Sequence, residues 1–204
     1  MAYSQFTLEM LEERFGLLVR NAPGSLFAET PETQPTEMLT KLLERHLPTA
    51  RDVGTEAARS SLLVAPILAE AVALSGGGIG FFPGIELNVD RKQGLQGFCD
   101  YVIAQTPTLL EVRAPIIAIV EAKREDITAG IPQCVATMYA AQLFNERKLR
   151  PLPRTYGAVT SGTNWRFLAL HDSLAQVDTV EYNLDDLPQI LGIFLAMMQV
   201  ATSV

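Results

Sequence analysis

At 204 residues, with 48% apolar and 19% charged residues, the chain has the length and composition of one folded globular protein with a substantial core. Its formal net charge of −7 argues against a uniformly basic nucleic-acid-binding surface. The chain has two histidines and two cysteines, Cys99 and Cys134, without a CxxC pair or a histidine cluster, which argues against a zinc site. The N-terminus lacks a basic segment followed by an apolar run. The apolar stretch Ile190–Val200 is shorter than the about 20 residues that cross a bilayer, so we expect a cytoplasmic protein without membrane contact.

The first 50 residues show helical patterns only. Apolar residues recur at helical spacing over Thr7–Leu18, and Thr36 is a candidate N-cap for a second amphipathic helix. His46 lies on the apolar side of that helix and is predicted to be a core-edge or surface histidine rather than a ligand. The pattern divides the chain into a helical N-terminal extension, residues 1–50, and an α/β domain, residues 51–204.

A long helical segment is predicted from Asp52 to Ser75. Pro66 in its middle must kink or restart the helix, because proline removes a helical hydrogen bond. Two acids lie along the segment, Glu56 and Glu70, which would fall nearly on one face of a straight helix.

Strands and helices alternate in the rest of the chain. In order, the pattern predicts extended runs at Ile79–Phe82 and Ile85–Val89, a turn at Asp90–Gln96, strands around Asp100 and ending at Glu121, a helix at Gln133–Arg147, a hairpin at Tyr156–Leu170, an edge strand within Asp178–Leu184 and an apolar helix at Leu187–Val200. The broad apolar surface of the last helix suits burial in the core or a dimer interface. This order predicts an α/β fold with a mixed sheet between helices.

The apolar run Ile116–Val120 ends abruptly in Glu-Ala-Lys. Apolar residues on both faces indicate a strand that is covered on both sides. Because side chains alternate along a strand, Ile117, Ile119, Glu121 and Lys123 are predicted to share one face. If the strand around Asp100 pairs with this strand, a second carboxylate joins Glu121. Such buried charges are costly unless they pair with each other, a metal or a ligand.

One acid followed by Glu-x-Lys at the end of a buried strand resembles the active-site signature of the PD-(D/E)xK nuclease superfamily. The resemblance implies a restriction-endonuclease-like core, with a central mixed β-sheet flanked by helices. It is closest to the nuclease-like N-terminal domain of type I restriction motor subunits, through an acid-bearing helix with Pro66-Ile-Leu68 and the hairpin sequence Thr160-Ser-Gly-Thr-Asn-Trp-Arg-Phe167. The likeness covers about residues 52–184, and no motor domain follows in this sequence.

The resemblance assigns a metal site. In that superfamily the first acid and the Glu of Glu-x-Lys hold one or two Mg²⁺ or Mn²⁺ ions, which maps onto Asp100 and Glu121, with the Ala122 carbonyl as a further ligand. The lysine maps onto Lys123, where it would orient or activate the attacking water and steady the charge that develops on the phosphate.

Two helices supply the remaining candidates. Many members carry a glutamate on the first helix that assists the metal; Glu56 fits that position best, and Glu70 is the alternative. Some branches place a glutamine on the helix after Glu-x-Lys, and Gln133 fits that position.

The resemblance therefore implies a Mg²⁺- or Mn²⁺-dependent nuclease that hydrolyses DNA phosphodiester bonds with a metal-activated water, with a homodimer as one arrangement that would address both strands. An alternative is a non-catalytic binding or regulatory module that keeps the nuclease fold, which the acidic charge favours and the intact carboxylate and lysine set disfavours. A third candidate is a metal-dependent enzyme that acts on another phosphoester, such as RNA or a nucleotide.

Overall fold

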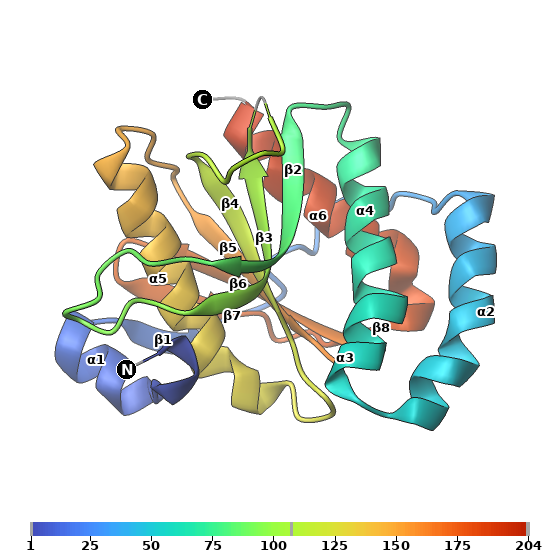
Figure 1. Ribbon diagram of the computed structural model, residues 1–204, viewed down its shortest axis with the longest axis horizontal. Coiled ribbons are helices and arrows are strands. Elements are labelled where there is room, and N and C mark those ends of the chain that lie inside the picture. The colour runs from blue at the N-terminus through green and yellow to red at the C-terminus, as the bar shows by residue number, and fades with distance from the viewer. Residues whose placement is uncertain (1, 107, 203–204) are drawn as a thin grey trace.

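In the computed structural model, which describes residues 2–106 and 108–202, helices cover both faces of an eight-stranded sheet (Figure 1). The strands are β1 Leu18–Asn21, β2 Ile79–Glu86, β3 Phe98–Gln105, β4 Ile116–Ala122, β5 Thr155–Thr160, β6 Asn164–His171, β7 Leu174–Val177 and β8 Tyr182–Asn183. The α-helices are α1 Leu8–Phe15, α2 Glu37–Val53, α3 Glu56–Arg59, α4 Ala65–Leu74, α5 Ile131–Arg147 and α6 Leu187–Thr202.

The sheet is mixed, as the sequence predicted. Its strand order is β1-β7-β6-β5-β4-β3-β2, and β8 pairs with β6. Strands β2, β3 and β4 form an antiparallel meander, whereas β4 and β5 are parallel. A parallel pair needs a crossover connection, and α5 provides it between β4 and β5. The α/β class is confirmed.

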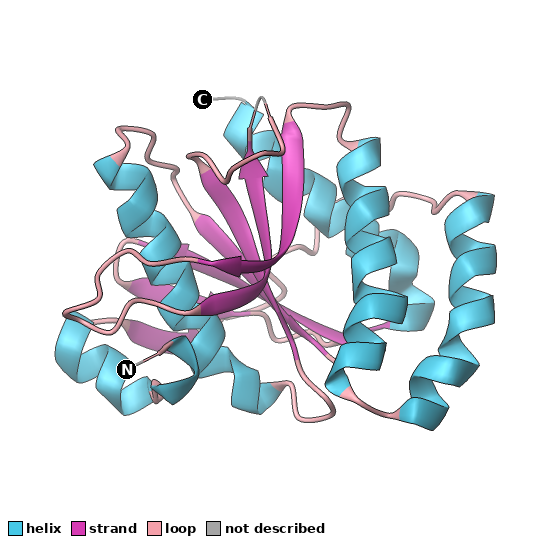
Figure 2. Ribbon diagram, in the orientation of Figure 1, coloured by secondary structure: helices cyan, strands magenta, loops and turns pink. Residues whose placement is uncertain are grey.

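Two apolar cores lie between the sheet and the helices on its two faces. Figure 2 shows these helices on either side of the sheet. Helices α1 and α5 cover one face, and α2, α4 and α6 contribute to the core on the other face. Trp165, Phe167 and Phe194 are fully buried there, with ring centroids 5.4–6.4 Å apart. The apolar surface of α6 is therefore used for the core, one of the two roles that its composition suited.

The N-terminal 50 residues contain more than helices. Leu18, predicted to end the first helix, begins strand β1 instead, because Gly16 adopts a left-handed conformation (φ 66°) and ends α1. Strand β1 pairs in parallel with β7 at one edge of the sheet. Neither strand was predicted, since both are only four residues long and carry no clear alternation. The Thr36 N-cap is confirmed: its side chain accepts a hydrogen bond from the Leu39 N–H at 3.3 Å.

Three other strand and helix boundaries differ from the sequence pattern. The two extended runs predicted after Gly78 merge into one strand, β2, which ends at Glu86 rather than at Val89. Strand β2 contains Pro83, and proline is tolerated there because β2 is an edge strand of the sheet. The predicted edge strand Asp178–Leu184 shortens to β8. The predicted helix Asp52–Ser75 is divided, because Gly54 in a left-handed conformation ends α2 and Thr55 caps a new helix.

That new helical run, Glu56–Leu74, contains a π-helical turn at Ser60–Val64, which is separated from Pro66 by Ala65 alone. Proline has no N–H to donate to the carbonyl of Leu62, and a π-turn commonly accommodates such a defect. The ring nitrogen Nδ1 of His46, on α2, lies 3.0 Å from that Leu62 carbonyl, which can only accept. His46 is therefore a structural histidine at the core edge, as predicted.

Glu56–Leu74 is also the one helix, within the described part of the chain, that is long and apolar enough by composition to cross a membrane. The core helix of a soluble protein passes the same test. Leu63, Ile67 and Leu68 of this run are fully buried in the core that lies against the sheet. The run is thus compatible with a soluble protein.

We expect His46→Ala to lower the free energy of unfolding by about 1–3 kcal/mol, because the Leu62 carbonyl loses its donor in a partly buried position. Urea unfolding measures this loss. In a Pro66→Ala background, which restores a backbone N–H one turn after Leu62, the same substitution should cost less. His171→Ala, at an exposed position, is the matched control. Equal costs with and without Pro66 would contradict the pairing of His46 with the proline defect.

Candidate active site

The pairing of β3 with β4 brings Asp100 and Glu121 together. The antiparallel register pairs Tyr101 with Val120 and Val102 with Ile119, so Asp100 continues the ladder opposite Glu121. The Ala122 N–H donates a hydrogen bond to Asp100 Oδ2 at 2.8 Å. The two carboxylates predicted from sequence are therefore neighbours at the end of adjacent strands.

Ile117 was predicted to lie on the same face of β4 as Glu121, and it lies on the opposite face. The register shifts between Ile103 and Ala104 of β3, because Ile117 is an extra, unpaired residue of β4 at this point, which makes a β-bulge. As a result Ile117 packs in the core beside α4 and α6, whereas Ile119 packs in the core beside α5, where Glu121 meets Gln133 of that helix. The predicted alternation is correct from Ile119 onward and wrong before it.

The Glu121 side chain is completely buried, with an exposed fraction of 0%. Gln133 Nε2, in the first turn of α5, donates to Glu121 Oε2 at 2.6 Å. Lys123 Nζ lies 3.9 Å from the same oxygen. The other oxygen, Oε1, is buried and has no hydrogen-bond partner among the residues described. One oxygen of this carboxylate is thus held in place while the other is left for a ligand.

This environment raises the pKa of Glu121 well above its ordinary value of 4.5. Burial is the main cause, and the nearby Asp100 carboxylate is the next. The positive charge of Lys123 acts in the opposite direction, and the negative charge of Glu56 adds to the increase. A second positive charge near Glu121 would therefore be strongly favourable.

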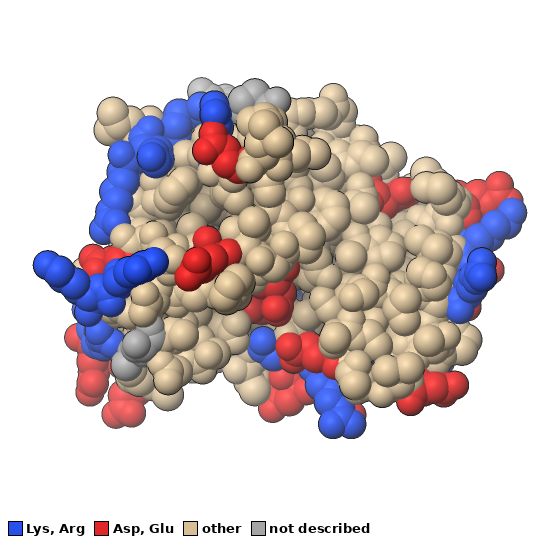
Figure 3. Space-filling view, in the orientation of Figure 1, with Lys and Arg blue, Asp and Glu red and all other residues tan. Residues whose placement is uncertain are grey.

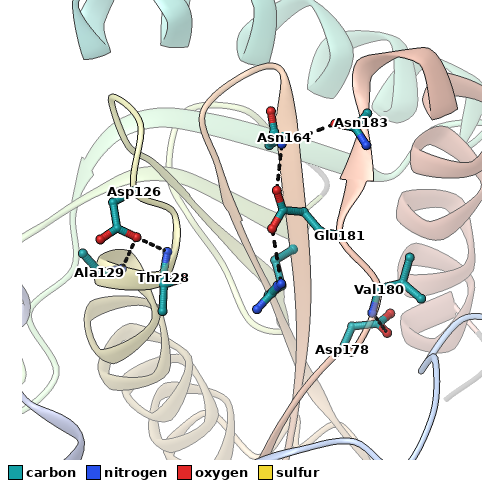
Figure 4. A network of polar contacts seen from close by, with 9 residues as sticks. Asp126, Thr128, Ala129, Asn164, Asp178, Val180, Glu181 and Asn183 are labelled. Atoms are coloured by element: carbon teal, nitrogen blue, oxygen red, sulfur yellow. Dashed lines mark hydrogen bonds and ion pairs between the residues drawn. The ribbon is translucent and has the colours of Figure 1, made fainter.

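The Lys123 side chain can extend to the Glu121 carboxylate because the residue beside its stem, Gly130, has no side chain. A Cβ added at Gly130 would lie 3.0 Å from both Cγ and Cε of Lys123 and 2.6 Å from Val159 Cγ1. Gly130 precedes α5, and Asp126 fixes this corner by accepting hydrogen bonds from the N–H groups of Thr128 and Ala129 at 2.9 and 3.2 Å (Figure 4). Gly130 thus leaves the space that the Lys123 side chain occupies. The sequence analysis did not identify this glycine, whose only sequence signal is its position just before a helix.

The two glutamates predicted as alternatives lie in different environments. Glu70 is buried and accepts a hydrogen bond from the Thr36 N–H at 2.8 Å, which ties α4 to the start of α2. Glu56 is exposed at the start of α3, and its charge acts on Glu121. The geometry favours Glu56 as the more distant acid of the site and gives Glu70 a structural role.

The residues present fit a hard divalent cation that keeps much of its water. In the described part of the chain, no three His, Cys, Asp or Glu side chains are grouped closely enough to hold a metal ion together. Asp100 and Glu121 nevertheless provide two adjacent carboxylates, and Glu121 Oε1 is a buried oxygen in need of a partner. Mg²⁺ prefers oxygen ligands and is commonly bound through one or two carboxylates, with water completing its shell. Asp100, Glu121 and the Ala122 carbonyl are the candidate protein ligands.

No protein-family model matches this chain, and no curated protein matches it. The interpretation of the site therefore depends on its geometry.

We expect Glu121→Gln to stabilise the metal-free protein at high pH. A carboxyl whose pKa is raised by folding contributes stability below its unfolded pKa, about 4.5, and that stability is lost as the pH rises through the raised value. Glutamine has the same shape and never ionises, so the variant should exceed the wild type by about 1–3 kcal/mol at pH 8 and match it at pH 4. Urea unfolding in EDTA measures both, with the exposed Glu125→Gln as control. A variant less stable than the wild type at pH 8 would show that ionised Glu121 is well compensated.

Proposed function

We propose that this protein is a Mg²⁺- or Mn²⁺-dependent nuclease with a restriction-endonuclease-like core that hydrolyses DNA phosphodiester bonds. The observation that carries the proposal is the fully buried Glu121 carboxylate facing Asp100, with one oxygen bound to Gln133 and the other without a protein partner among the described residues. Two adjacent carboxylates, one of them fully buried, are destabilising when both are ionised, unless a cation or a proton neutralises their charge.

The residues divide the chemistry between them. Asp100 and Glu121 would hold a divalent ion, which would lower the pKa of water so that hydroxide is available as the nucleophile near neutral pH. Gln133 fixes the orientation of Glu121 by donating a hydrogen bond to its Oε2. Lys123 Nζ is partly exposed and lies on the solvent side of the carboxylate pair, where it can donate to the attacking water or to a phosphate oxygen.

The order of elements supports the fold part of the proposal. The run α3–α4, the antiparallel meander β2–β3–β4, the crossover helix α5 and the parallel strand β5 follow the order expected of the nuclease core. The carboxylates lie on the second and third strands of the meander, and the glutamine lies at the start of the crossover helix.

The distribution of charge supports a nucleic-acid substrate in spite of the net charge of −7. Figure 3 shows Lys and Arg side chains in a run along one edge, over the C-terminal end of α5 and the β2–β3 loop. The cations of these segments and of the nearby β3–β4 loop are Arg91, Lys92, Arg113, Arg147, Lys148 and Arg150. A local run of cations binds a phosphate backbone without reading sequence.

We expect metal-dependent cutting of single-stranded, nicked or duplex DNA with Mn²⁺ or Mg²⁺. Lys123→Ala should reduce the rate about 10²–10⁴-fold, because a positioned proton donor in the transition state is lost. Lys41→Ala, an exposed lysine on α2, is the matched control and should cut at the wild-type rate. Cutting that persists in Lys123→Ala would show that the activity belongs to another site or to a contaminant.

Metal binding can be tested without cleavage. Mn²⁺ or Mg²⁺ at about 100 times its Kd should stabilise the wild-type protein by about 2.7 kcal/mol, seen as a rise in melting temperature. Asp100→Asn should remove the rise, whereas Asp52→Asn, an exposed acid on α2, should keep it.

These two measurements separate the candidate functions. Metal binding without cutting of any DNA would favour the non-catalytic binding module, or an enzyme on another phosphoester if RNA is cut instead. Neither metal binding nor cutting would overturn the assignment of the site.

A further inference from the structure

Arg59 is a half-buried cation, and no acidic side chain among the described residues forms an ion pair with it. The other partly buried cations with known partners, Lys123 and Arg166, lie within 4 Å of Glu121 and Glu181 respectively. Arg59 Nη1 instead donates to the Ser161 carbonyl at 3.3 Å and to Thr163 Oγ1 at 3.5 Å. Its Nε is buried and has no hydrogen-bond partner among the described residues. An uncompensated guanidinium in such a place favours the binding of an anion.

A cavity of about 250 Å³ lies beside this guanidinium. Its polar lining consists of Arg51, Arg59, Thr163, Asn164, Asn183 and Asp185. Two arginines against one aspartate leave the lining with a positive charge, and the amides and the hydroxyl add neutral hydrogen-bonding groups. Arginine presents a planar fork of donors that matches the oxygens of a phosphate.

The wall of the cavity is a rigid hairpin turn. Gly162 has φ 83°, and a Cβ there would lie 3.1 Å from Leu63 Cδ1, so the turn packs directly against the helix that bears Arg59. Thr160 Oγ1 accepts a hydrogen bond from the Gly162 N–H at 2.8 Å. Asn164 Nδ2 donates to Glu181 at 2.7 Å, and Figure 4 shows this contact together with the one to Asn183. The pocket is therefore formed before any ligand binds.

The pocket and the carboxylates lie at the same end of the sheet. The hairpin turn begins after Thr160, which pairs with Ala122 in the parallel β4–β5 ladder, and the Lys123 N–H donates to the Thr160 carbonyl at 2.7 Å. Glu56, whose charge acts on Glu121, is on the same short helix as Arg59. A ligand that crosses this end of the sheet, from the face covered by α5 to the face beside α2 and α3, would reach both Lys123 and the Arg59 pocket.

We propose that the Arg59 pocket binds a phosphate of the nucleic-acid substrate that neighbours the phosphate to be cleaved. This inference rests on the proposed function, since it assigns a flanking subsite to the same active site. The cavity has room for a phosphate and part of its sugar, and its two arginines are the groups that match phosphate oxygens. The pocket would thus fix the position of the strand rather than its sequence.

The test is the binding of a fluorescent single-stranded oligodeoxynucleotide to Lys123→Ala protein with Mg²⁺, so that the strand stays intact. Arg59→Gln should weaken binding about tenfold and reduce the salt dependence by about one phosphate contact. Arg51→Gln should act in the same direction; Arg51 is exposed, so its loss leaves the fold intact if Arg59→Gln fails to fold. Arg45→Gln, an exposed arginine on the same helix α2, is the matched control.

A cleavage assay separates this inference from the proposed function. If the wild type cuts DNA and the Arg59 and Arg51 variants bind and cut like the Arg45 control, the subsite is wrong and the nuclease stands. If nothing is cut but binding falls in both variants, the subsite stands without the catalysis. If inorganic phosphate raises the melting temperature of the wild type only, and oligonucleotide binding is equal in all variants, the pocket takes free phosphate and the inference is overturned.

Discussion

The burial of the Glu121 carboxylate at the end of an entirely apolar strand is the constraint on which the candidate site depends. Strand β4 is buried along its whole length, so its one charged residue, Glu121, has no access to bulk water. The Gln133 amide of α5 and the Lys123 ammonium, two residues further along the chain, reduce the free-energy cost of burying this charge. The Asp100 carboxylate increases that cost. This balance leaves the site short of positive charge, which is the property that suits a divalent cation.

The rest of the architecture keeps this arrangement in place. The β3–β4 register fixes Asp100, and the crossover to the parallel strand β5 forces α5 to begin beside the end of β4. Gly130 then allows α5 to start close enough for Gln133 to reach Glu121 while the Lys123 stem passes alongside. A bulkier residue at Gly130 would have to displace the lysine or the helix, so the glycine links backbone packing to side-chain chemistry.

Sequence pattern predicted the parts of the site that depend on local order. The apolar strand ending in Glu121 and Lys123 was recognisable from its apolar run and alternation, whereas Gln133 was proposed only through the resemblance, which places a glutamine on the next helix. Ile117 was misplaced because a bulge depends on the partner strand rather than on local sequence. Strands β1 and β7 were missed for the same reason: short segments become strands only through their pairing. The environment of Arg59 could not be predicted from local sequence either, because its hydrogen bonds are to a hairpin about 100 residues away along the chain.

The net charge of −7 can be reconciled with a nucleic-acid substrate through the same electrostatic effects. An acidic protein that binds a polyanion must keep its carboxylates away from the phosphates or neutralise them, because like charges repel over about a Debye length. Here the acids nearest the site, Asp100 and Glu121, point at each other and would be neutralised by a cation. Arg59 lies on one side of them, and the basic run near the end of α5 lies at the far end of that helix. In the proposed nuclease, the metal would therefore change the local field from repulsive to attractive for a phosphate backbone, so substrate binding itself would depend on the ion.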